Sequence, residues 1–460
     1  GADPPPGVYR GKVILRQPET GQSLAVQELA VRVWDFAIPR RSQFIALYDV
    51  RYGPGREWWG KPFEEMYPKI VQFMAERRLC PDTVRPAPRL RWVDGKVEAD
   101  FSEFDKAAEW YFDHLGLPVA YMPFDFYLFG WGLPPKHIAG IAPYPGEFPY
   151  TEVDRSNLRP EYKQAYQALL RTFWNHVRER GWADRFVLYL SDEPFADQEP
   201  IRKQFLALCR MIHEVDPHIP IYSSTWRFVE DWVEDLDIWG IGHYGIVPVE
   251  KMAELKNLGK RIWFTTDGQM CLDTPFCAIE RLLPYYCYKF GAKGYEFWGV
   301  SWFTYNPHKF GWHAFIHQTD QPGRSYYVRY PNGDGYLIYP GFPETDREIL
   351  SSIRFEQARE GVEDYEYLVL AEQLLREFGR EHAQSSLIRT LQRALTQVLE
   401  LVSVPAPQGR YSTQILPEPE KLERLRSELA EAIEAVCREF SLSGQTTSPA
   451  RQLSRGSKIP

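Results

Sequence analysis

The chain has 460 residues, which is more than one ordinary domain needs and enough for an α/β barrel with additional segments. Its formal net charge of -8 argues against a nucleic-acid partner, because proteins that bind nucleic acids carry a basic surface. Hydrophobic residues make up 44% of the chain and allow a large core, but no apolar run is long enough to span a membrane. The aromatic fraction of 15% is high and slightly favours a carbohydrate ligand, since aromatic rings stack on the C–H faces of sugars.

The cysteine spacing and the absence of two known motifs limit the possible cofactors, but the sequence does not identify the cellular compartment. The six cysteines show no zinc-ligand spacing, and we expect buried free thiols, with a disulfide among Cys271, Cys277 and Cys287 as the alternative. The patterns H-E-x-x-H and G-x-S-x-G are absent, so we expect neither a metal nor another cofactor. Residues 1–7 contain no initiator Met and no signal peptide, which predicts a trimmed or processed start. The compartment (export included) and the oligomeric state (a homo-oligomer included) stay open.

The segment before the first helix predicts a short β region. Val8–Leu15 and Leu24–Phe36 are extended runs, too few for an independent sandwich. We therefore expect residues 1–40 to form an N-terminal β segment that is the remnant of a β-sandwich.

From about Gln43, short apolar runs alternate with amphipathic segments. The predicted strands are Phe44–Val50, Val84–Trp92, Val119–Phe126, Phe186–Ser191, Ile219–Ser224, Leu236–Ile241, Arg261–Thr266 and Gly294–Val300. The predicted helices lie near 62–79, 101–115, 160–180, 199–215, 227–234, 249–258 and 276–290. This order, over roughly 250 residues, predicts an α/β fold, a (β/α)8 TIM barrel over residues 41–380. A doubly wound open sheet is the alternative, although no Gly-rich phosphate loop follows the first strand.

The C-terminal part predicts a helical extension. A long helix from Arg347 to Phe378 fits the last helix of the barrel. Helical segments near 383–402 and 418–440 follow, so we expect C-terminal helices over residues 381–440. Residues 441–460 are rich in Ser, Thr and Gln and predict a disordered tail.

The most informative motif is Asp192-Glu193-Pro194, directly after the apolar run Phe186–Ser191. In a (β/α)8 barrel the catalytic groups lie at the carboxyl ends of the strands, which is where this pair falls. Two adjacent carboxylates do not both ionise freely, so we expect one pKa to rise toward the working range of a general acid. The structural alternative is that Asp192 caps a helix whose first turn contains Pro194.

The other predicted strand ends also supply acidic or aromatic side chains, as the pocket of a glycosidase requires. The candidate substrate-binding residues are Asp125, Trp226, His243, Tyr244, Asp267, Trp298 and Trp302. Five of them have a structural alternative: Asp125 as a cap of the following loop, His243 as a partner of a backbone group, Asp267 as a turn residue, and Trp298 and Trp302 as core. Glu296 lies one residue earlier in its strand than a position at the mouth requires, so a buried ion pair is at least as good an explanation of this residue.

Several segments occur together in one chain: Asp192-Glu193 after a strand, Trp298-Gly-Val-Ser-Trp302, Asn332-Gly-Asp-Gly-Tyr-Leu-Ile-Tyr-Pro-Gly341 and the acidic run 352–367. Together they resemble glycoside hydrolase family 123, whose catalytic region is also called domain of unknown function 4091. The resemblance covers about residues 25–380 and is strongest over 186–195 and 294–370.

This resemblance implies a (β/α)8 barrel and retaining hydrolysis of terminal β-linked N-acetylgalactosamine, or another N-acetylhexosamine, by substrate assistance. In this reaction the sugar's own 2-acetamido oxygen attacks the anomeric carbon and forms an oxazoline. By the resemblance, Glu193 is the general acid/base and an ionised Asp192 orients the acetamido group. Tyr244 is placed near that group, and Trp298 and Trp302 around the sugar ring. Family members usually carry an N-terminal β-sandwich, whereas only about forty residues precede the predicted barrel here.

Two other readings of the same residues stay open. In an ordinary retaining glycosidase, Glu193 would be the acid/base and Asp267 the nucleophile, with their carboxyl groups about 5–5.5 Å apart. In a non-catalytic carbohydrate-binding barrel, Asp192 and Glu193 would point into packed protein. The acidic helix Arg354–Tyr367 is expected to form a structural network of ion pairs rather than a catalytic group.

Overall fold

The protein is described by a computed structural model that places residues 4–42, 44–53, 56–266, 279–303, 306, 335–342, 348–402 and 419–441. The chain divides into two compact units. The barrel unit comprises Arg41–Tyr365 and Val402–Pro419. The second unit comprises Gly1–Arg40, Glu366–Leu401 and Glu420–Pro460.

The barrel unit is built around eight parallel strands. In chain order they are β3 (Ile45–Tyr48), β4 (Cys80–Pro81), β7 (Ala120–Tyr121), β9 (Phe186–Asp192), β10 (Ile221–Arg227), β11 (Ile238–Ile246), β12 (Arg261–Thr266) and β13 (Gly294–Phe297). Each pairs in parallel with its neighbours in the order β4-β3-β13-β12-β11-β10-β9-β7. A parallel bridge between Thr83 and Tyr121 brings the two ends of this order together. The predicted (β/α)8 barrel is confirmed.

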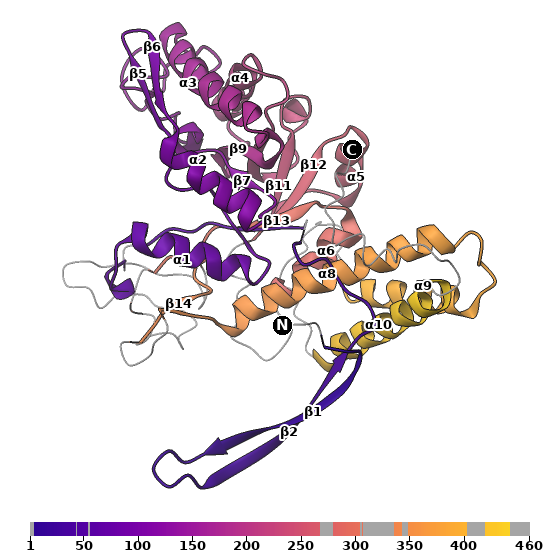
Figure 1. The fold of residues 1–460 in the computed structure, drawn as a ribbon. Helices are drawn as coiled ribbons and strands as arrows, with labels where there is room; N and C mark the ends of the chain where they lie inside the picture. The colour runs from indigo at the N-terminus through magenta and orange to yellow at the C-terminus, as the bar shows by residue number, and fades with distance from the viewer. Residues whose placement is uncertain are drawn as a thin grey trace. The chain divides into compact units, whose positions relative to one another are not determined.

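Helices follow most of the strands along the chain, as the alternating pattern predicts (Figure 1). They are α1 (Phe63–Ala75), α2 (Ser102–Ala108), α3 (Pro160–Glu179), α4 (Glu199–His213), α5 (Val249–Asn257), α6 (Ile279–Phe290) and α8 (Ile353–Phe378). The helix α4 illustrates why these segments are helical. Its buried side chains Ile201, Phe205, Leu208 and Ile212 recur every three or four residues and therefore share one face.

The second predicted strand is wrong. The barrel strand is the two-residue β4, and residues Arg89–Val93 (β5) instead form a hairpin with Lys96–Asp100 (β6) outside the barrel sheet. The third predicted strand is too long: after β7, Pro123 lacks a backbone N–H, and Phe124–Phe126 form a short 3-10 turn (η3). The predicted helix at 227–234 is reduced to a 3-10 turn at Glu230–Trp232 (η5).

Aromatic side chains fill part of the barrel interior. Tyr121 and Tyr222 stack with ring centroids 5.6 Å apart, and Trp263 lies 5.1 Å from Tyr222. The hydroxyl groups of Tyr48 and Tyr295 are 2.7 Å apart, so each ring buries its apolar part while its hydroxyl keeps a partner. The described part of the interior is therefore packed with side chains, and the rim at the carboxyl ends of the strands is where a substrate is expected to bind.

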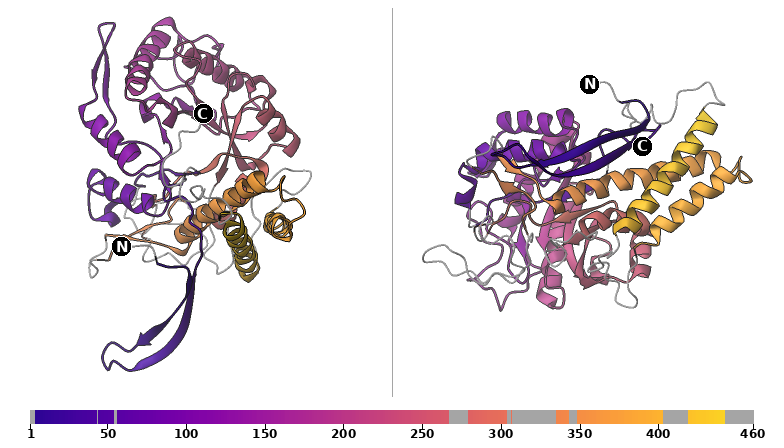
Figure 2. Two further views of the ribbon diagram at one scale, coloured as in Figure 1. Left: turned by 45° about the vertical axis from the view of Figure 1, so that its right-hand side comes forward. Right: turned by 90° about the horizontal axis from the view of Figure 1, so that it is seen from below.

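The second unit contains a β-hairpin and helices. The strands β1 (Gly7–Arg16) and β2 (Ser23–Val33) form a long antiparallel ribbon (Figures 1 and 2). The helices α9 (Ser386–Leu399) and α10 (Pro419–Ser441) match two predicted segments. Arg32 binds Glu431 and Glu434 of α10, each at 3.0 Å, and ties the end of the ribbon to that helix.

Two further expectations concern thiols and charged groups. Cys80, Cys209 and Cys287 are buried free thiols and Cys437 is a partly buried one, whereas Cys271 and Cys277 lie outside the described residues. The acidic start of α8 forms the expected ion-pair network: Arg359 binds Glu356 and Glu363. No helix in the described part of the chain has the length and the apolar character that crossing a membrane requires.

Candidate active site

The pair Asp192-Glu193 lies at the carboxyl end of β9, in a sharply turned backbone. Glu193 has a φ of +42°, a left-handed conformation that costs a non-glycine residue about 1–2 kcal/mol. The turn is held from two sides. The Trp131 N–H donates to the carbonyl oxygen of Asp192 at 2.8 Å, and the Glu193 N–H donates to Oγ of Ser224 at 2.8 Å. Strained residues that the surroundings hold in place are concentrated at active sites.

Asp192 accepts two hydrogen bonds on one oxygen. The hydroxyl groups of Tyr189 and Ser224 donate to its Oδ1 at 2.9 and 3.0 Å. Its Oδ2 has no hydrogen-bond partner among the residues that the structure describes. Burial raises the pKa of Asp192, while the two hydroxyl donors and the charge of Arg51 oppose that rise. The carboxyl group is thus fixed in orientation, with one oxygen available to a ligand.

Glu193 is half-buried and faces a tryptophan. The indole N–H of Trp131 donates to its Oε2 over 3.4 Å, and the Trp131 side chain is itself 47% exposed. Since Ser224 contacts both members of the pair, the orientation of Glu193 is coupled to that of Asp192. Neither acid caps a helix: the N-cap of the following helix, α4, is Gln198.

Glu296 is a third carboxyl group in electrostatic reach of this pair. It lies in β13, only 6% exposed, and accepts hydrogen bonds from the hydroxyl groups of Tyr222 and Thr265. Burial, and then the charges of Asp192 and Glu193, raise its pKa to about 7. Its partners among the described residues are hydroxyl groups, so the alternative of a buried ion pair is not observed there.

The ends of β3 and β4 carry a second group of charges. Asp49 and Asp82 directly follow these neighbouring strands, and the Val50 N–H donates to Oδ1 of Asp82 at 3.1 Å. Arg51 binds Asp49 (Nη2 to Oδ2, 2.7 Å), and Arg85 lies 3.6 Å from Asp82. Burial, and then the neighbouring Asp82, raise the pKa of Asp49 well above its usual range.

Trp302 lies beside Arg51, and Trp298 packs against Trp302. The guanidinium carbon of Arg51 is 5.1 Å from the ring centroid of Trp302, whose ring meets that of Trp298 edge to face at 6.2 Å. Both indoles are partly exposed. Gly335 has a φ of +84°, and a Cβ there would lie 2.3 Å from the Trp298 ring, so only glycine allows this contact. The motifs around 298–302 and 335 thus pack directly against each other.

Comparison with known proteins identifies the family. A model described as "Glycoside hydrolase 123, catalytic domain" matches residues 89–371, more than half of the chain. The chain belongs to glycoside hydrolase family 123. This confirms the expected family and a carbohydrate substrate. No curated protein matches the chain significantly.

One of the similar solved structures supports the fold. A family 123 glycoside hydrolase from Clostridium perfringens is similar with a TM-score of 0.57 and 15% identity, over 95% of this chain and 77% of that chain. A family 2 β-galacturonidase from Eisenbergiella tayi has a TM-score of 0.37 and 14% identity, over 78% and 58% of the two chains. A β-galactosidase from Bacillus circulans sp. alkalophilus has a TM-score of 0.36 and 10% identity, over 72% and 57%. Only the first value is high enough to support an argument, and it supports the barrel.

In the present structure some of the predicted site residues lie next to each other. Asp192 and Glu193 adjoin each other, and so do Trp298 and Trp302. Asp125 is exposed in η3, and its contact with sugar stays a prediction. For the remaining candidates the structure describes only the backbone or nothing: Trp226 lies in β10, His243 and Tyr244 lie in β11, and Asp267 is outside the described residues.

Sequence reasoning missed several groups that contact the pair or surround it. Ser224 is the last residue of a predicted strand, but no function was predicted for it. Asp49 falls inside another predicted strand. The signal that would have found Asp49 and Asp82 is an acidic residue immediately after each of two adjacent barrel strands. Tyr189 and Trp131 carry no such signal, because their contacts depend on the tertiary turn. Within the described residues, no group of three or more His, Cys, Asp and Glu could hold a metal ion.

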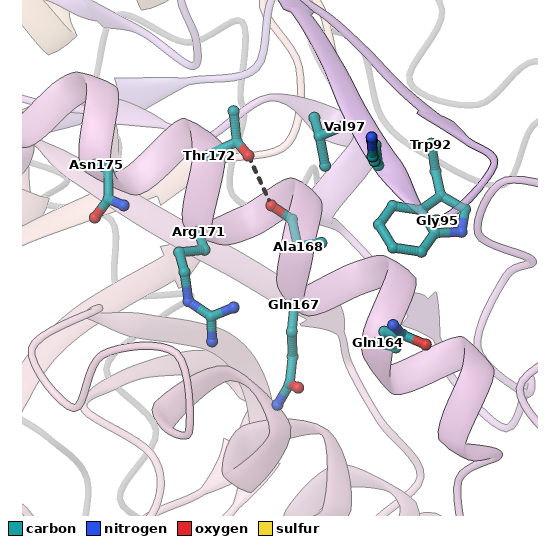
Figure 3. Close-up of a pocket in the computed structure, with 10 residues that line it drawn as sticks. Trp92, Gly95, Val97, Gln164, Gln167, Ala168, Arg171, Thr172 and Asn175 are labelled. Atoms are coloured by element: carbon teal, nitrogen blue, oxygen red, sulfur yellow. Dashed lines mark hydrogen bonds between the residues drawn. The ribbon is translucent and has the colours of Figure 1, made fainter.

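A separate groove of about 550 Å³ lies on the outside of the barrel unit, between α3 and the β5–β6 hairpin (Figure 3). Its lining residues are Trp92, Gly95, Lys96, Val97, Gln164, Gln167, Ala168, Arg171, Thr172 and Asn175. None of these side chains is a carboxylic acid, so the groove lacks the proton donor that glycosidic cleavage needs.

Proposed function

We propose that the protein hydrolyses terminal β-linked N-acetylgalactosamine, or another N-acetylhexosamine, with retention of configuration and by substrate assistance. The observation that carries this proposal is the locked turn at the end of β9, where adjacent carboxyl groups differ in their surroundings. Asp192 keeps Oδ2 without a partner among the described residues, and Glu193 projects beside a partly exposed indole. Membership in family 123 supports the same assignment.

In the first step the acetamido oxygen of the sugar attacks the anomeric carbon, and the bond to the leaving oxygen breaks. Glu193 donates its proton to that oxygen, so the leaving group departs as a neutral alcohol. Asp192 accepts a hydrogen bond from the acetamido N–H through Oδ2 and stabilises the positive charge that develops on the oxazoline ring. The Tyr189 and Ser224 hydroxyl groups hold Asp192 for this contact.

In the second step water attacks the anomeric carbon and opens the oxazoline. Glu193, now ionised, takes a proton from that water, and the acetamido group is restored. Two inversions at the same carbon give net retention. Adjacent residues suit this division of work, because the acetamido group on C2 and the leaving oxygen on C1 are neighbours on the sugar.

A panel of 4-nitrophenyl β-glycosides with and without the 2-acetamido group tests the proposal. We expect cleavage only of substrates with the group, and strong inhibition by a thiazoline analogue of the oxazoline, since such analogues bind more tightly than substrates. Asp192→Asn should lower kcat by about 10²-fold or more, with KM nearly unchanged, as for a group that acts mainly in the transition state.

Two other outcomes would replace the mechanism. Equal cleavage of glycosides without the acetamido group, with no thiazoline inhibition, would favour the ordinary retaining reaction in which Glu193 is the acid/base and Asp267 the nucleophile. Binding of sugars without any turnover would favour a carbohydrate-binding barrel. The partial exposure of Asp192 and Glu193 disfavours the latter, because a scaffold barrel would pack them away.

A further inference from the structure

The pair Arg51 and Asp49 lies at the same rim of the barrel as the β9 turn but belongs to another part of it. Asp49 follows β3, and β3 is separated from β9 by β4 and β7 in the barrel order. Because all eight strands are parallel, their carboxyl ends meet at one rim. The positive charge of Arg51 also opposes the rise in the pKa of Asp192 that burial causes, which is consistent with the two sides lying near each other.

The backbone that carries this pair is firmly held. The Asp49 N–H donates to the carbonyl oxygen of Phe297 at 3.0 Å, and the Val300 N–H donates to that of Asp49 at 3.0 Å. The Ser301 hydroxyl donates to the carbonyl oxygen of Arg51, also at 3.0 Å. Residues 49–51 and the segment that bears Trp298 and Trp302 therefore form one rigid wall of the mouth.

The side chains of this wall are half-open rather than sealed. Arg51 keeps 42% of its side-chain surface exposed and Asp49 keeps 22%. The Nε of Arg51 is buried and has no hydrogen-bond partner among the residues that the structure places. Arg51 thus lies between the carboxyl group of Asp49 and the indole of Trp302, and the exposed part of its guanidinium side chain is available to a ligand.

We propose that Arg51 and Asp49 together bind the sugar hydroxyl groups that lie across the ring from the anomeric carbon, on C4 and C6. A hydroxyl group donates one hydrogen bond and accepts others; the guanidinium supplies donors and the carboxylate supplies acceptors. Trp302, stacked against Arg51, offers an apolar surface for the C–H face of the same ring. This inference rests on the proposed function, which places C1 and C2 at Glu193 and Asp192, since C4 is then the ring atom farthest from the acids.

Deoxy substrates test the contact directly. We would measure kcat/KM for 4-nitrophenyl 2-acetamido-2-deoxy-β-galactoside and for its 4-deoxy and 6-deoxy analogues. The wild type should lose about 10- to 100-fold on at least one analogue, as expected for a hydrogen bond to a charged group. For Arg51→Ala, kcat/KM on the parent substrate should be lower than that of the wild type by a similar factor. Within this variant, kcat/KM on the deoxy analogue should then be less than about 3-fold below kcat/KM on the parent substrate.

Two more variants separate contact from folding. Asp49→Asn keeps the shape of the side chain and should also reduce the deoxy effect, whereas Arg51→Lys should restore part of it. The control is Arg171→Ala, which removes an exposed arginine of α3 that lines the outer groove (Figure 3) and should leave the deoxy effect at its wild-type size. Thermal unfolding should give similar midpoints for all variants.

An unchanged deoxy effect in both Arg51→Ala and Asp49→Asn would overturn the inference. If the wild type cleaves only glycosides that lack the acetamido group, the proposed mechanism fails, but the same comparison with those glycosides and their deoxy analogues still decides the role of the pair. If nothing is cleaved, calorimetric binding of N-acetylgalactosamine and its 4-deoxy and 6-deoxy analogues replaces kcat/KM, and the absence of any difference between them overturns it.

Discussion

Carboxyl groups lie on two sides of the barrel mouth, and the two sides hold them in different ways. At the end of β9, neutral hydroxyl groups of Tyr189 and Ser224 donate to Asp192. At the ends of β3 and β4, the guanidinium groups of Arg51 and Arg85 face Asp49 and Asp82. Hydroxyl donors orient a carboxyl group without adding a full positive charge, whereas a guanidinium neutralises it. The first arrangement suits a proton-transfer and charge-stabilising role, and the second suits binding of a neutral sugar.

The largest effect should come from removing the proposed proton donor, Glu193, on the β9 side. In Glu193→Gln we expect kcat on substrates with poor leaving groups to fall by about 10²–10⁴-fold, the usual contribution of general acid catalysis. The loss should be much smaller for nitrophenyl leaving groups, which depart without protonation. Steady-state kinetics with both classes of leaving group measures this difference. The same substitution at Glu109, an exposed residue after α2, should have no effect. Equal losses for the two leaving groups would contradict the assignment.

A smaller effect should follow from loosening the β9 turn. Ser224→Ala removes the acceptor of the Glu193 N–H and a donor to Asp192, which we expect to lower kcat/KM by about 10- to 100-fold. The matched control is Ser223→Ala: Ser223 is buried and donates to the carbonyl oxygen of Ser191, but contacts neither acid. Both variants should lose a similar amount of thermal stability, and only Ser224→Ala should lose activity. Equal activity of the two would show that the turn does not depend on Ser224.

The smallest expected effect on the mouth concerns stability rather than rate. Because the pKa of Glu296 is raised from 4.5 to about 7, its stabilising contribution is complete below pH 4.5 and is lost as pH rises toward 7. Glu296→Gln removes this loss, so the free energy of unfolding of the variant relative to the wild type should increase over that window, by about 3 kcal/mol at most. Urea unfolding between pH 4.5 and 8 measures the change. A constant difference across the window would mean that Glu296 is ionised throughout.

The fold was largely predictable because the apolar runs of the later strands are long. Arg261–Thr266 was predicted with its observed bounds, and Phe186–Ser191 falls short by one residue. The prediction of the second strand was wrong because β4 has only two residues, one of them Pro81, and so short a strand shows no hydrophobic alternation. The alternating run Arg89–Val93 was taken in its place. The turn Asp94-Gly95, with φ of +48° and +78°, is a hairpin signal that identifies this run as half of a hairpin.

The site was predictable in its acids but not in what holds them. Asp192 and Glu193 follow a recognisable strand, so their place at the rim could be inferred. The shared contact of both with Ser224 could not, because it depends on the parallel pairing of β9 with β10 and on an irregular register there. The role of Arg51 could not be predicted either. Its contact with Trp302 joins residues 251 positions apart in the sequence, and no local sequence pattern indicates it.

The β1–β2 ribbon has a consequence for handling the protein in solution. Cross-strand pairing places Tyr9, Val13, Leu15, Leu29 and Val31 on the same side, and all five are exposed. Among the described strands, each of the two pairs only with the other, so both outer edges keep unpaired backbone groups. An exposed hydrophobic face combined with unpaired strand edges favours pairing of the ribbon with other β-strands, including those of a second copy of the ribbon. At high concentration the protein should therefore aggregate first through the β1–β2 ribbon. Lysine substitutions on its hydrophobic face should improve solubility without changing residues of the barrel rim.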